Sequence, residues 1–549
     1  MKLIIRENGT AHLQSAQTSP ALLRVIRSLE GRRKNLKAGG FSIEPTPSNI
    51  ARLADAFPLE VLVEGEVEKR PPPPAPKGSY QIKTEPMPHQ REAMKLVRSV
   101  THSALFMEQG TGKSKVAIDR AGDLYHDGRI SGVLTFAPKG VHRQWIVEQL
   151  EIHLGCPFRG AWWPLKKGDA ASILPGEGLA WFSINVDAMK TEKGFQACVD
   201  FITAHEGRVM MIGDETHTIM NVTSARAKAA AKLGKMCAFR MALTGTPLAK
   251  DLINVWGQLR WLDENILGFR YMSAFRNEFC IMGGFQGRKI IGNRNMARYR
   301  EQVDPYTFRV TKEDIGIVPA WRSRWEFDLT REQRQVIRDL KKDLISKIDS
   351  GEIVSAANAA VAMMRMQQVS NGFFVDEDKN VIRLMEPEKN PRVIALKELL
   401  ASRGGKGIVW ARFIPDIEII REALQADGHS VAAYNGATSD KDRVKAVDAF
   451  LAPEGEGVNY FLSNPAAGGT GLNLQGACDY DVFYSNSDNA IQRWQAESRG
   501  HRIGMKGTFT HFDLVAPFSQ DKMILGRHAA KEAISEMAIG DIRKMLEEM

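Results

Sequence analysis

The sequence predicts an α/β protein with two doubly wound parallel-sheet lobes, helical insertions and a small N-terminal α+β domain. Short apolar strands alternate with helical stretches in two arrays, and strands with so few polar residues are typical of parallel sheets buried on both faces. A less regular, helix-rich zone over residues 262–395 separates the arrays. A proline run at 71–74 precedes the first array and favours an extended linker. Two βαβ arrays with a helical insert between them indicate two lobes.

The residues ahead of the prolines form a separate unit. Residues 1–68 are expected to form an accessory domain, followed by a linker over 69–80. The segment SPALLRVIRSLEG predicts an amphipathic helix with Ser19 as its N-cap and Pro20 in its first helical position. A second helix is expected to begin near Ser48, in TPSNIARLADAF.

The first array predicts lobe 1 over residues 81–310, with a helical protrusion, and the second predicts lobe 2 over 396–515. Residues 311–395 between them are expected to form a helical brace and protrusion, and 516–549 a C-terminal helical tail. The strands expected in lobe 1 cover 103–107, 132–137, 179–184, 208–213 and 239–244. Those expected in lobe 2 cover 407–411, 430–434, 459–463, 481–484 and 508–514.

Composition limits the class of protein. With 549 residues, 43% of them hydrophobic, the chain can bury several cores. No apolar run approaches the roughly 18 residues that a membrane span needs, and the start MKLIIRENGTAHLQ lacks the apolar stretch of a signal peptide. Five cysteines lie scattered without CxxC pairs, which argues against a disulfide scaffold and a structural zinc site. The net charge of +9 weakly favours a polyanionic partner.

The strongest local signal is MEQGTGKS, placed between an apolar strand and a helical stretch. Glycines let the backbone wrap around phosphates, and the helix that follows adds its positive N-terminal end. The pattern predicts a phosphate loop in which Lys113 reaches the β and γ phosphates and Ser114 ligates Mg²⁺. Met107 stands in place of the usual first glycine, so a plain glycine-rich turn is the alternative. The loop residues expected to bind ATP are Gly110, Thr111, Gly112, Lys113 and Ser114.

An acidic pair, Asp214 and Glu215, follows the apolar strand RVMMIG about a hundred residues later. Acidic side chains at the carboxyl end of a buried strand lie where a Mg²⁺-bound nucleotide needs them. Asp214 is expected to hold the metal, and Glu215 to orient or deprotonate the attacking water. A solvated turn with two acids is the alternative.

Together these segments resemble a superfamily two helicase-like ATPase, most of all the Swi/Snf-type branch of DNA translocases and remodellers. The segment ALTGTPLAKDLINVWGQLRWL (242–262) resembles the branch's third motif, and MPHQ resembles the motif whose glutamine, here Gln90, reads adenine. FAPKGVHRQWIVEQL resembles the strand and helix whose loop, here with Lys139, meets the nucleic-acid backbone. The resemblance implies a coupling role for His217, Thr244, Gly245 and Thr246.

The stretch 462–504 in the second array resembles the fused fifth and sixth motifs of the same branch. Gln495, Arg499 and Arg502 match its Q-x-x-x-R-x-x-R spacing, and Gly471 lies in its glycine-rich part. The resemblance implies that Gln495 and Gly471 contact ATP and that both arginines stabilise the charge of a transferring phosphoryl group. Without the resemblance, this segment would be an exposed basic helix end.

Weaker matches concern DNA contacts. NGATSDKDRVKAVDAF resembles a segment of the second lobe whose threonine meets a backbone phosphate, which makes Thr438 and Arg443 candidates; helix-start residues are the alternative. The first 68 residues faintly resemble the small domain that precedes the motor in annealing-helicase relatives. Arg32 and Arg33 there are candidates for a phosphate-binding patch, with a solvated loop as the alternative.

Four positions depart from the branch pattern. Thr216 replaces an alanine within the acidic motif, and we expect it to be tolerated because its neighbours are intact. Asn464 and Pro465 alter the start of the fifth motif, and Met505 replaces the glutamine that usually ends the sixth. Every group needed for hydrolysis is present, so the departures bear on DNA contact and coupling.

The sequence therefore predicts two RecA-like lobes that form an ATP-dependent DNA translocase or helicase-like motor, with ATP and Mg²⁺ as cofactors and double-stranded or branched DNA as partner. A strand-separating DNA or RNA helicase is one alternative. A nucleic-acid clamp gated by ATP, or the motor subunit of a defence or restriction complex with a protein partner, is another. The expected location is the cytoplasm of a bacterial or bacteriophage-infected cell.

Overall fold

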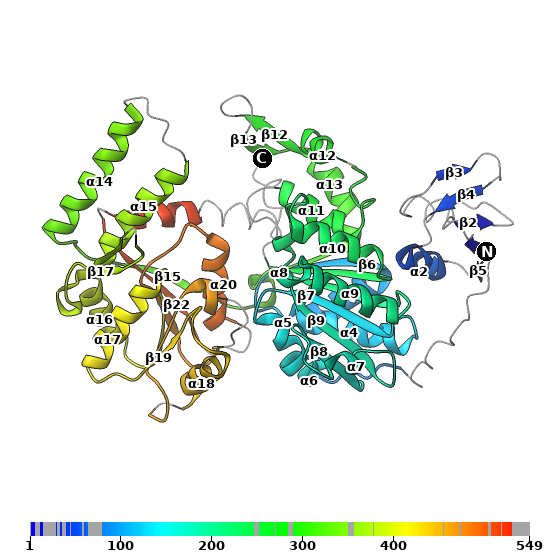
Figure 1. Ribbon diagram of the computed structural model, residues 1–549, viewed down its shortest axis with the longest axis horizontal. Helices are drawn as coiled ribbons and strands as arrows, with labels where there is room; N and C mark the ends of the chain where they lie inside the picture. Colours follow the sequence, from blue (N-terminus) through cyan, green and yellow to red (C-terminus); the bar gives the residue numbers. More distant parts are fainter. Residues whose placement is uncertain are drawn as a thin grey trace. The chain divides into compact units, whose positions relative to one another are not determined.

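The protein divides into two compact units, residues 1–311 and 312–533, which are described separately (Figure 1). The computed structural model describes short stretches between residues 2 and 63 and then, apart from brief gaps at 377, 454, 470–471, 473, 503–506 and 518, residues 79–245, 252–269, 271–283, 289–349 and 356–529. No helix within these residues is both long enough and apolar enough to cross a bilayer.

The described N-terminal residues form a five-stranded sheet in the order β3-β4-β2-β1-β5 and one helix. Pairing is antiparallel except between β1 and β5. Helix α2 (Pro47–Ala56) begins close to Ser48, as the sequence predicts, whereas the helix expected after Ser19 lies outside the described residues. The strands are β1 (Lys2–Ile5), β2 (Ala11–Gln14), β3 (Arg33–Asn35), β4 (Gly40–Ile43) and β5 (Glu60–Val63).

Helix α2 packs against lobe 1 through buried polar contacts. The Ser48 hydroxyl lies 2.6 Å from Nε2 of His102, and Arg52 forms a 2.6 Å ion pair with Asp263. Arg240 also donates to the Ser48 hydroxyl, at 3.3 Å. Buried charges and hydroxyls are tolerated only when they are paired, so these contacts fix α2 to the lobe.

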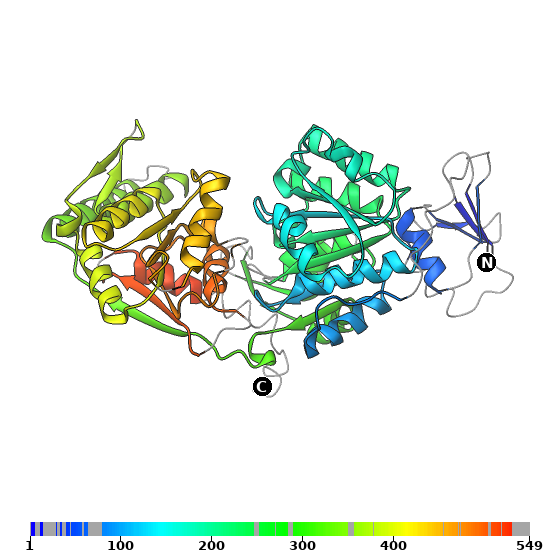
Figure 2. The same cartoon turned by 90° about the horizontal axis from the view of Figure 1, so that it is seen from below.

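Lobe 1 contains a seven-stranded, all-parallel sheet in the order β14-β6-β11-β10-β7-β9-β8, with helices on both faces (Figure 2). All five predicted strands are present. The two edge strands, β8 and β14, were not predicted from the sequence, since both are half-exposed and neither carries a continuous apolar run. The strands are β6 (His102–Met107), β7 (Gly132–Ala137), β8 (Phe158–Trp162), β9 (Leu179–Asn185), β10 (Val209–Asp214), β11 (Phe239–Thr244) and β14 (Thr307–Val310).

An insertion precedes β14 in lobe 1, in the region where a helical protrusion is predicted. It holds two helices and a short antiparallel hairpin. Its elements are α12 (Met272–Phe279), β12 (Cys280–Gly283), β13 (Lys289–Asn293) and α13 (Met296–Val303).

Lobe 2 contains a six-stranded, all-parallel sheet in the order β15-β22-β21-β18-β20-β19. Alternate residues along β18 enter different cores: Val409 packs on one face, while Ile408 and Trp410 pack on the other. This period of two is expected for a strand covered on both sides. The strands are β15 (Trp321–Glu326), β18 (Gly407–Trp410), β19 (Val431–Tyr434), β20 (Tyr460–Ser463), β21 (Tyr480–Phe483) and β22 (Thr510–Val515).

The segment predicted as a helical brace, 311–395, is helical only in part. It supplies helices α14 (Arg331–Asp349) and α15 (Ala356–Asn371), but also the edge strand β15. Polar and apolar residues both occur in β15, because one side of an edge strand is exposed. The segment therefore has no apolar run from which a strand could be predicted. The predicted C-terminal tail is described only to residue 529, with helix over 521–529.

The fold class predicted from the sequence is confirmed: two parallel-sheet α/β lobes with helical insertions follow a small α+β unit. The structure divides the chain at Thr311/Lys312. The other domain limits stay predictions.

Candidate nucleotide-binding site

A glycine-rich loop joins β6 to helix α4 (Lys113–His126) in lobe 1. Gly110 and Gly112 have φ of +83° and +86°, in the left-handed region that favours glycine. A Cβ at Gly112 would also lie 2.2 Å from Nε2 of Gln90 and would displace the Gln90 amide from its place against the loop. The loop therefore turns tightly enough to direct its backbone and the N-terminus of α4 toward one point.

The predicted phosphate-binding lysine lies over its own loop. Nζ of Lys113 donates to the carbonyl oxygens of Met107 (2.8 Å) and Glu108 (3.1 Å). The Glu108 N–H donates to the Val310 carbonyl of β14 at 2.8 Å, and the Thr111 hydroxyl donates to the Glu108 carbonyl at 2.7 Å. These bonds hold the loop closed around the ammonium group. Ser114 follows in the first turn of α4 and is half-buried.

Helix α3 (Pro88–Ser99) rests against the same loop. The Gln90 side chain accepts from the Met87 N–H at 2.9 Å and donates to the Gly112 carbonyl at 3.3 Å. Nε2 of His89 lies 2.8 Å from the Thr111 carbonyl oxygen. The glutamine predicted to read adenine is thus next to the loop predicted to hold phosphates.

The acidic pair ends β10 at the edge of the sheet where the loop follows β6. Asp214 is half-buried and accepts a 3.0 Å hydrogen bond from the Trp145 indole. Burial, with a smaller contribution from the Glu215 charge, raises the pKa of Asp214 to about 6, while Lys113 acts in the opposite direction. The lysine and the carboxylate are therefore close enough to interact, although 101 positions in the sequence numbering separate them.

Glu215 itself has an unusual backbone conformation, with φ of +53°. Its carboxylate lies 3.1 Å from Nδ1 of His217, and the Thr244 hydroxyl lies 3.5 Å from the same nitrogen. A non-glycine residue in the left-handed region costs free energy and is concentrated at functional sites. The described coupling residues therefore form a connected group with Glu215.

Gly245 brings the end of β11 against the phosphate loop. A Cβ there would lie 2.6 Å from Cγ of Gln109. Thr246, the fourth predicted coupling residue, lies outside the described residues. Thr216, the departure from the branch pattern, is accommodated because its hydroxyl donates to the buried Gln258 side chain at 2.7 Å.

In lobe 2, the predicted motif residues lie on helix α20 (Ala490–Gly500) and just beyond it. Arg499 is buried, and its guanidinium donates to the carbonyl oxygens of Gln495 and Leu472, both at 2.9 Å. Arg499 therefore ties the helix to the loop that follows β20. Arg502 lies two residues past the helix and is half-buried, and Gly471 lies outside the described residues.

A buried charge cluster anchors α20. Arg493 donates to Glu497 at 2.6 Å and to Asp513 of β22 at 3.1 Å, and its guanidinium lies 3.3 Å from the centroid of the Phe483 ring. Arg322 of β15 makes two hydrogen bonds to Glu497, at 2.7 and 3.0 Å. The edge strand β15 is thereby joined to the helix that carries Arg499.

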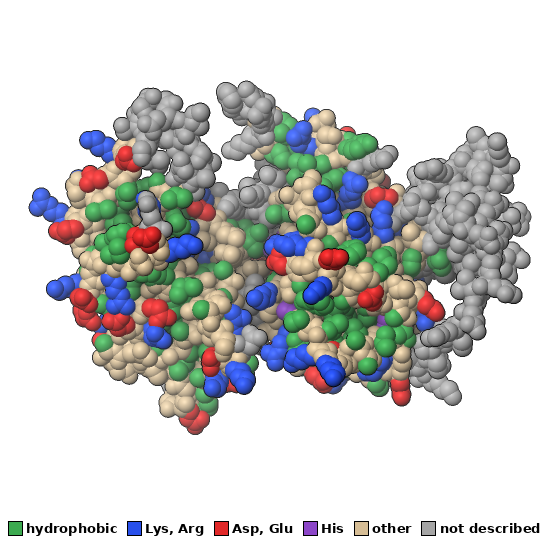
Figure 3. Space-filling model, in the orientation of Figure 1, with side chains coloured by type: hydrophobic (Ala, Val, Ile, Leu, Met, Phe, Trp, Pro, Cys, Tyr) green, Lys and Arg blue, Asp and Glu red, His purple; other side chains and the backbone are tan. Residues whose placement is uncertain are grey.

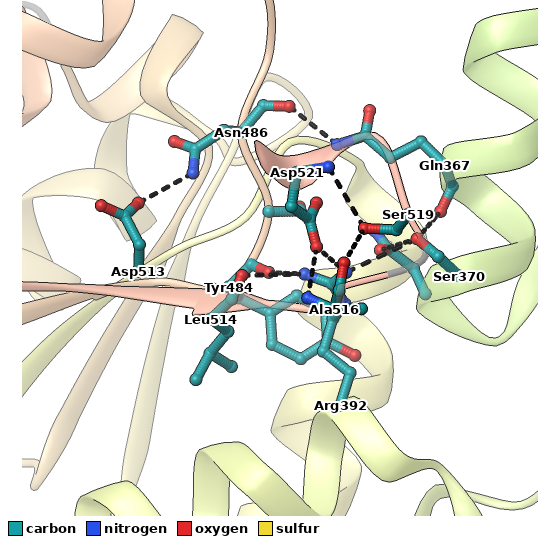
Figure 4. A network of polar contacts seen from close by, with 12 residues as sticks. Gln367, Ser370, Arg392, Tyr484, Asn486, Asp513, Leu514, Ala516, Ser519 and Asp521 are labelled. Carbon is teal, nitrogen blue, oxygen red and sulfur yellow. Dashed lines mark hydrogen bonds and ion pairs between the residues drawn. The ribbon is translucent and has the colours of Figure 1, made fainter. Parts of the chain in front are cut away.

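A second polar network reaches the same cluster from helix α15 (Figure 4). Gln367 donates to the Asn486 carbonyl at 2.8 Å, and the Asn486 amide donates to Asp513 at 2.9 Å. Arg392, fully buried, donates to the Tyr484 carbonyl and to Asp521, both at 2.6 Å. These residues were not predicted from the sequence. The one signal that the sequence contains is the i, i+4 spacing of Arg493 and Glu497, which is typical of an ion pair on a helix.

The predicted DNA-contact residues are dispersed. Lys139 is exposed in the loop after β7. In lobe 2 the Thr438 hydroxyl accepts from the Asn435 N–H at 2.9 Å, and Arg443 donates to the Asn435 carbonyl at 3.3 Å, so these two share a turn. Arg32 lies outside the described residues; Arg33 lies in β3.

A phosphate loop and an acidic pair on one parallel sheet, followed by a second such sheet, define the class of two-lobed helicase-like ATPases. Family models agree. The SNF2-related domain matches residues 89–373, more than half of the chain, and the helicase conserved C-terminal domain matches 391–504. The chain belongs to the SNF2-related family, as its motifs predict.

Curated relatives are distant and longer. A probable chromatin-remodeling complex ATPase chain of Oryza sativa subsp. japonica is 24% identical over 460 residues, covering 81% of this chain and 40% of that protein. The SWI/SNF-related matrix-associated actin-dependent regulator of chromatin subfamily A member 1 of Homo sapiens is 23% identical over 457 residues, covering 79% and 41%. The chain thus spans about two fifths of the length of these relatives.

A search of solved structures finds similarity to the Sulfolobus solfataricus SWI2/SNF2 ATPase core in complex with dsDNA. The identity is 18%, the TM-score is 0.39, and the match covers 85% of this chain and 97% of that chain.

Proposed function

We propose that the protein is an ATP-dependent DNA translocase or helicase-like motor that binds duplex or branched DNA and couples ATP hydrolysis to movement or remodelling. The observation that carries the proposal is the phosphate loop and the acidic pair at one edge of the lobe 1 sheet, in a chain of the SNF2-related family. Lobe 2 adds helix α20 with the candidate Arg499, and the candidate Arg502 two residues beyond that helix.

The residues present fit a magnesium nucleotide. Glycines form the loop, a Cβ at Gly112 would displace the Gln90 amide, and the half-buried carboxylate of Asp214 lies close enough to Lys113 for the two charges to interact. Carboxylate and hydroxyl oxygens are ligands that Mg²⁺ accepts. Asp214 and Ser114 would hold the metal, the loop and Lys113 would hold the phosphates, and Gln90 would contact the adenine. Bound Mg²⁺ would supply charge neutralisation for phosphoryl transfer.

Residues of the chain would then have separate roles in hydrolysis. Glu215, fixed by its left-handed backbone and by His217, would accept the proton of the attacking water. Arg499 and Arg502 would stabilise the charge that develops on the transferring group, with Gln495 and Gly471 beside it. Thr244, Gly245 and Thr246 would pass the state of this site to the DNA-binding surface.

A basic surface beside Lys139 supports the DNA part of the proposal. Arg143 and Lys166 lie 5.6 and 5.9 Å from the centroid of the Trp162 ring, so two cations flank one aromatic side chain. His142 of helix α5 (Val141–Gln144) contacts the carbonyl oxygen of Trp163, which directly follows β8, at 2.9 Å. Figure 3 shows Lys and Arg side chains around the place where Figure 1 labels α5. Such a surface suits sequence-independent contact with phosphates.

The partner in this proposal is DNA, and Thr438, Arg443, Arg32 and Arg33 remain candidate contacts. The proposed location is the cytoplasm of a bacterial or bacteriophage-infected cell, where such a cell keeps its DNA.

The test is the steady-state rate of ATP hydrolysis at fixed low salt. The rate is measured without nucleic acid and then with single-stranded, duplex or branched DNA or with RNA. The variant Lys113→Ala gives the background rate. We expect strong stimulation by duplex or branched DNA, and displacement of a third strand from a triplex during turnover. Stimulation by single strands or RNA alone would favour a strand-separating helicase. ATP binding without turnover under every condition would favour an ATP-gated clamp or a motor that needs a protein partner.

A further inference from the structure

We propose that Gln109 is a further catalytic residue, whose side-chain amide contacts the terminal phosphate of bound ATP. The inference rests on the proposed function, because it concerns the same phosphate loop. It adds a residue that the loop's motif does not include.

The Gln109 side chain is buried without hydrogen-bond partners. The residue is 6% exposed, and neither Nε2 nor Oε1 has a partner. Among the described residues, no other side-chain amide has both of its polar atoms buried in this way. A buried amide that makes no hydrogen bond is costly, so each such group in a folded protein needs an explanation.

The backbone on both sides of Gln109 is fixed, so the side chain cannot easily turn away. Glu108 before it is bonded through its N–H to Val310, and Gly110 after it has φ of +83°. The Gln109 side chain packs against Gly245. A Cβ at Gly245 would lie 2.6 Å from Cγ of Gln109 and 3.0 Å from the backbone nitrogen of Gln109, so a larger residue at 245 would displace this side chain. The side chain of Gln109 therefore lies between the phosphate loop and Gly245, the residue that follows β11.

The chemistry of the enclosed group matches the ligand proposed for this loop. An amide carries two N–H donors and a carbonyl acceptor. Phosphate oxygens accept hydrogen bonds, and the water that attacks a phosphate can donate one. The carbonyl oxygen of Glu108 accepts from the ammonium of Lys113. Gln109 therefore directly follows a residue that is bonded to the group expected to reach the terminal phosphates.

A purely structural role explains the residue less well. Methionine has nearly the same length and volume and would fill the same space without leaving polar atoms unpaired. A glutamine here lowers the stability of the nucleotide-free protein, and its amide gains hydrogen bonds only when a ligand binds. Groups that are unfavourable until a ligand binds are expected at functional sites.

The test uses the full chain and the variant Gln109→Met. We expect the melting temperature of the nucleotide-free variant to equal or exceed that of the parent. Affinity for a non-hydrolysable ATP analogue with Mg²⁺ should fall about tenfold, the loss of one hydrogen bond to a charged group. Affinity for ADP should change less than about twofold, because the contact is to the terminal phosphate. Turnover with duplex DNA should fall with the analogue affinity.

Gln258→Met is the matched control for stability. Gln258 is also a fully buried glutamine of lobe 1, but it is hydrogen-bonded to Thr216 (2.7 Å) and to the Asn254 carbonyl (3.1 Å). Its replacement should lower the melting temperature, in contrast to that of Gln109.

Two results would overturn the inference. One is a Gln109→Met protein that melts well below the parent without nucleotide, which would show that the amide has a structural partner. The other is equal loss, or no loss, of affinity for the ATP analogue and ADP. If the parent binds both nucleotides but hydrolyses ATP under no condition, the proposed function fails while this comparison of affinities still decides the role of Gln109.

Discussion

The phosphate loop region of lobe 1 and helix α20 of lobe 2 hold most of the residues proposed for nucleotide binding and hydrolysis, and they differ in how their polar groups are paired. In lobe 1, Asp214 has a raised pKa, Glu215 has a left-handed backbone and the Gln109 amide has no partner. In lobe 2, Arg493 and Arg499 are buried, and each is held by several hydrogen bonds.

The difference indicates a division of roles. Strained or incompletely paired polar groups can form additional hydrogen bonds or ion pairs when a ligand binds. This property suits a site that binds and releases a nucleotide in each cycle. Fully paired buried charges add little net stability, but they define one position for the helix that carries them, since breaking any pair is costly. Lobe 2 therefore acts as a rigid frame for its arginines, and changes in the two lobes should have different consequences.

The largest effect on chemistry is expected from Glu215→Gln. The amide cannot accept the proton of the attacking water, so turnover should fall by about 10²–10⁴-fold while ATP affinity stays within about twofold. Single-turnover hydrolysis and equilibrium binding of ATP measure the two quantities. Hydrolysis at the parental rate would show that the base lies elsewhere.

The largest effect on stability is expected in lobe 2, from Arg493→Met. It leaves Glu497 and Asp513 buried with fewer partners, so the free energy of unfolding of this lobe should fall by about 3–5 kcal/mol. Arg421→Met is the control, because its pair with Glu418 is exposed and should be worth less than about 1 kcal/mol. Urea denaturation measures both, and equal effects would contradict the frame described here.

A pH-dependent effect is expected at Asp416, which lies buried beneath Asn371 and Ser485. Burial raises the pKa of Asp416 to about 7, so between the unfolded and folded pKa values the folded protein binds more protons and loses stability as pH rises. The stability difference between parent and Asp416→Asn should therefore shift by up to about 4 kcal/mol from about pH 4 to about pH 8, in favour of the variant at high pH. A difference independent of pH would place the folded pKa of Asp416 near its ordinary value.

A smaller effect is expected from Lys113→Ala. Its ammonium makes two hydrogen bonds to loop carbonyl groups, which bound phosphates would replace. Losing one or two charge-assisted hydrogen bonds should weaken ATP binding by about 10–100-fold. Isothermal titration with ATP and Mg²⁺ measures this, and unchanged affinity would remove the loop from the site.

Sequence patterns predicted most of the sheets because buried parallel strands are continuously apolar. The strands β7 and β11 have the predicted limits, Gly132–Ala137 and Phe239–Thr244. The edge strands β8 and β15 were missed, since their exposed sides carry polar residues.

The site was predictable where a motif is local, as in the phosphate loop, and unpredictable where contacts join distant residues. The Trp145 indole donates a hydrogen bond to Asp214, 69 positions away in the sequence, and Arg322 donates to Glu497, 175 positions away. No sequence pattern predicts either pair. The unpaired amide of Gln109 could be recognised only once its surroundings were known.

The most direct test of the division between the lobes is the variant Arg502→Ala, with equilibrium ATP binding and turnover measured at saturating duplex DNA. If lobe 1 binds the nucleotide and the arginines of lobe 2 stabilise the transferring group, ATP affinity should stay within about twofold while turnover falls by about 10³-fold or more. Loss of ATP binding, or turnover at the parental rate, would contradict this division of roles.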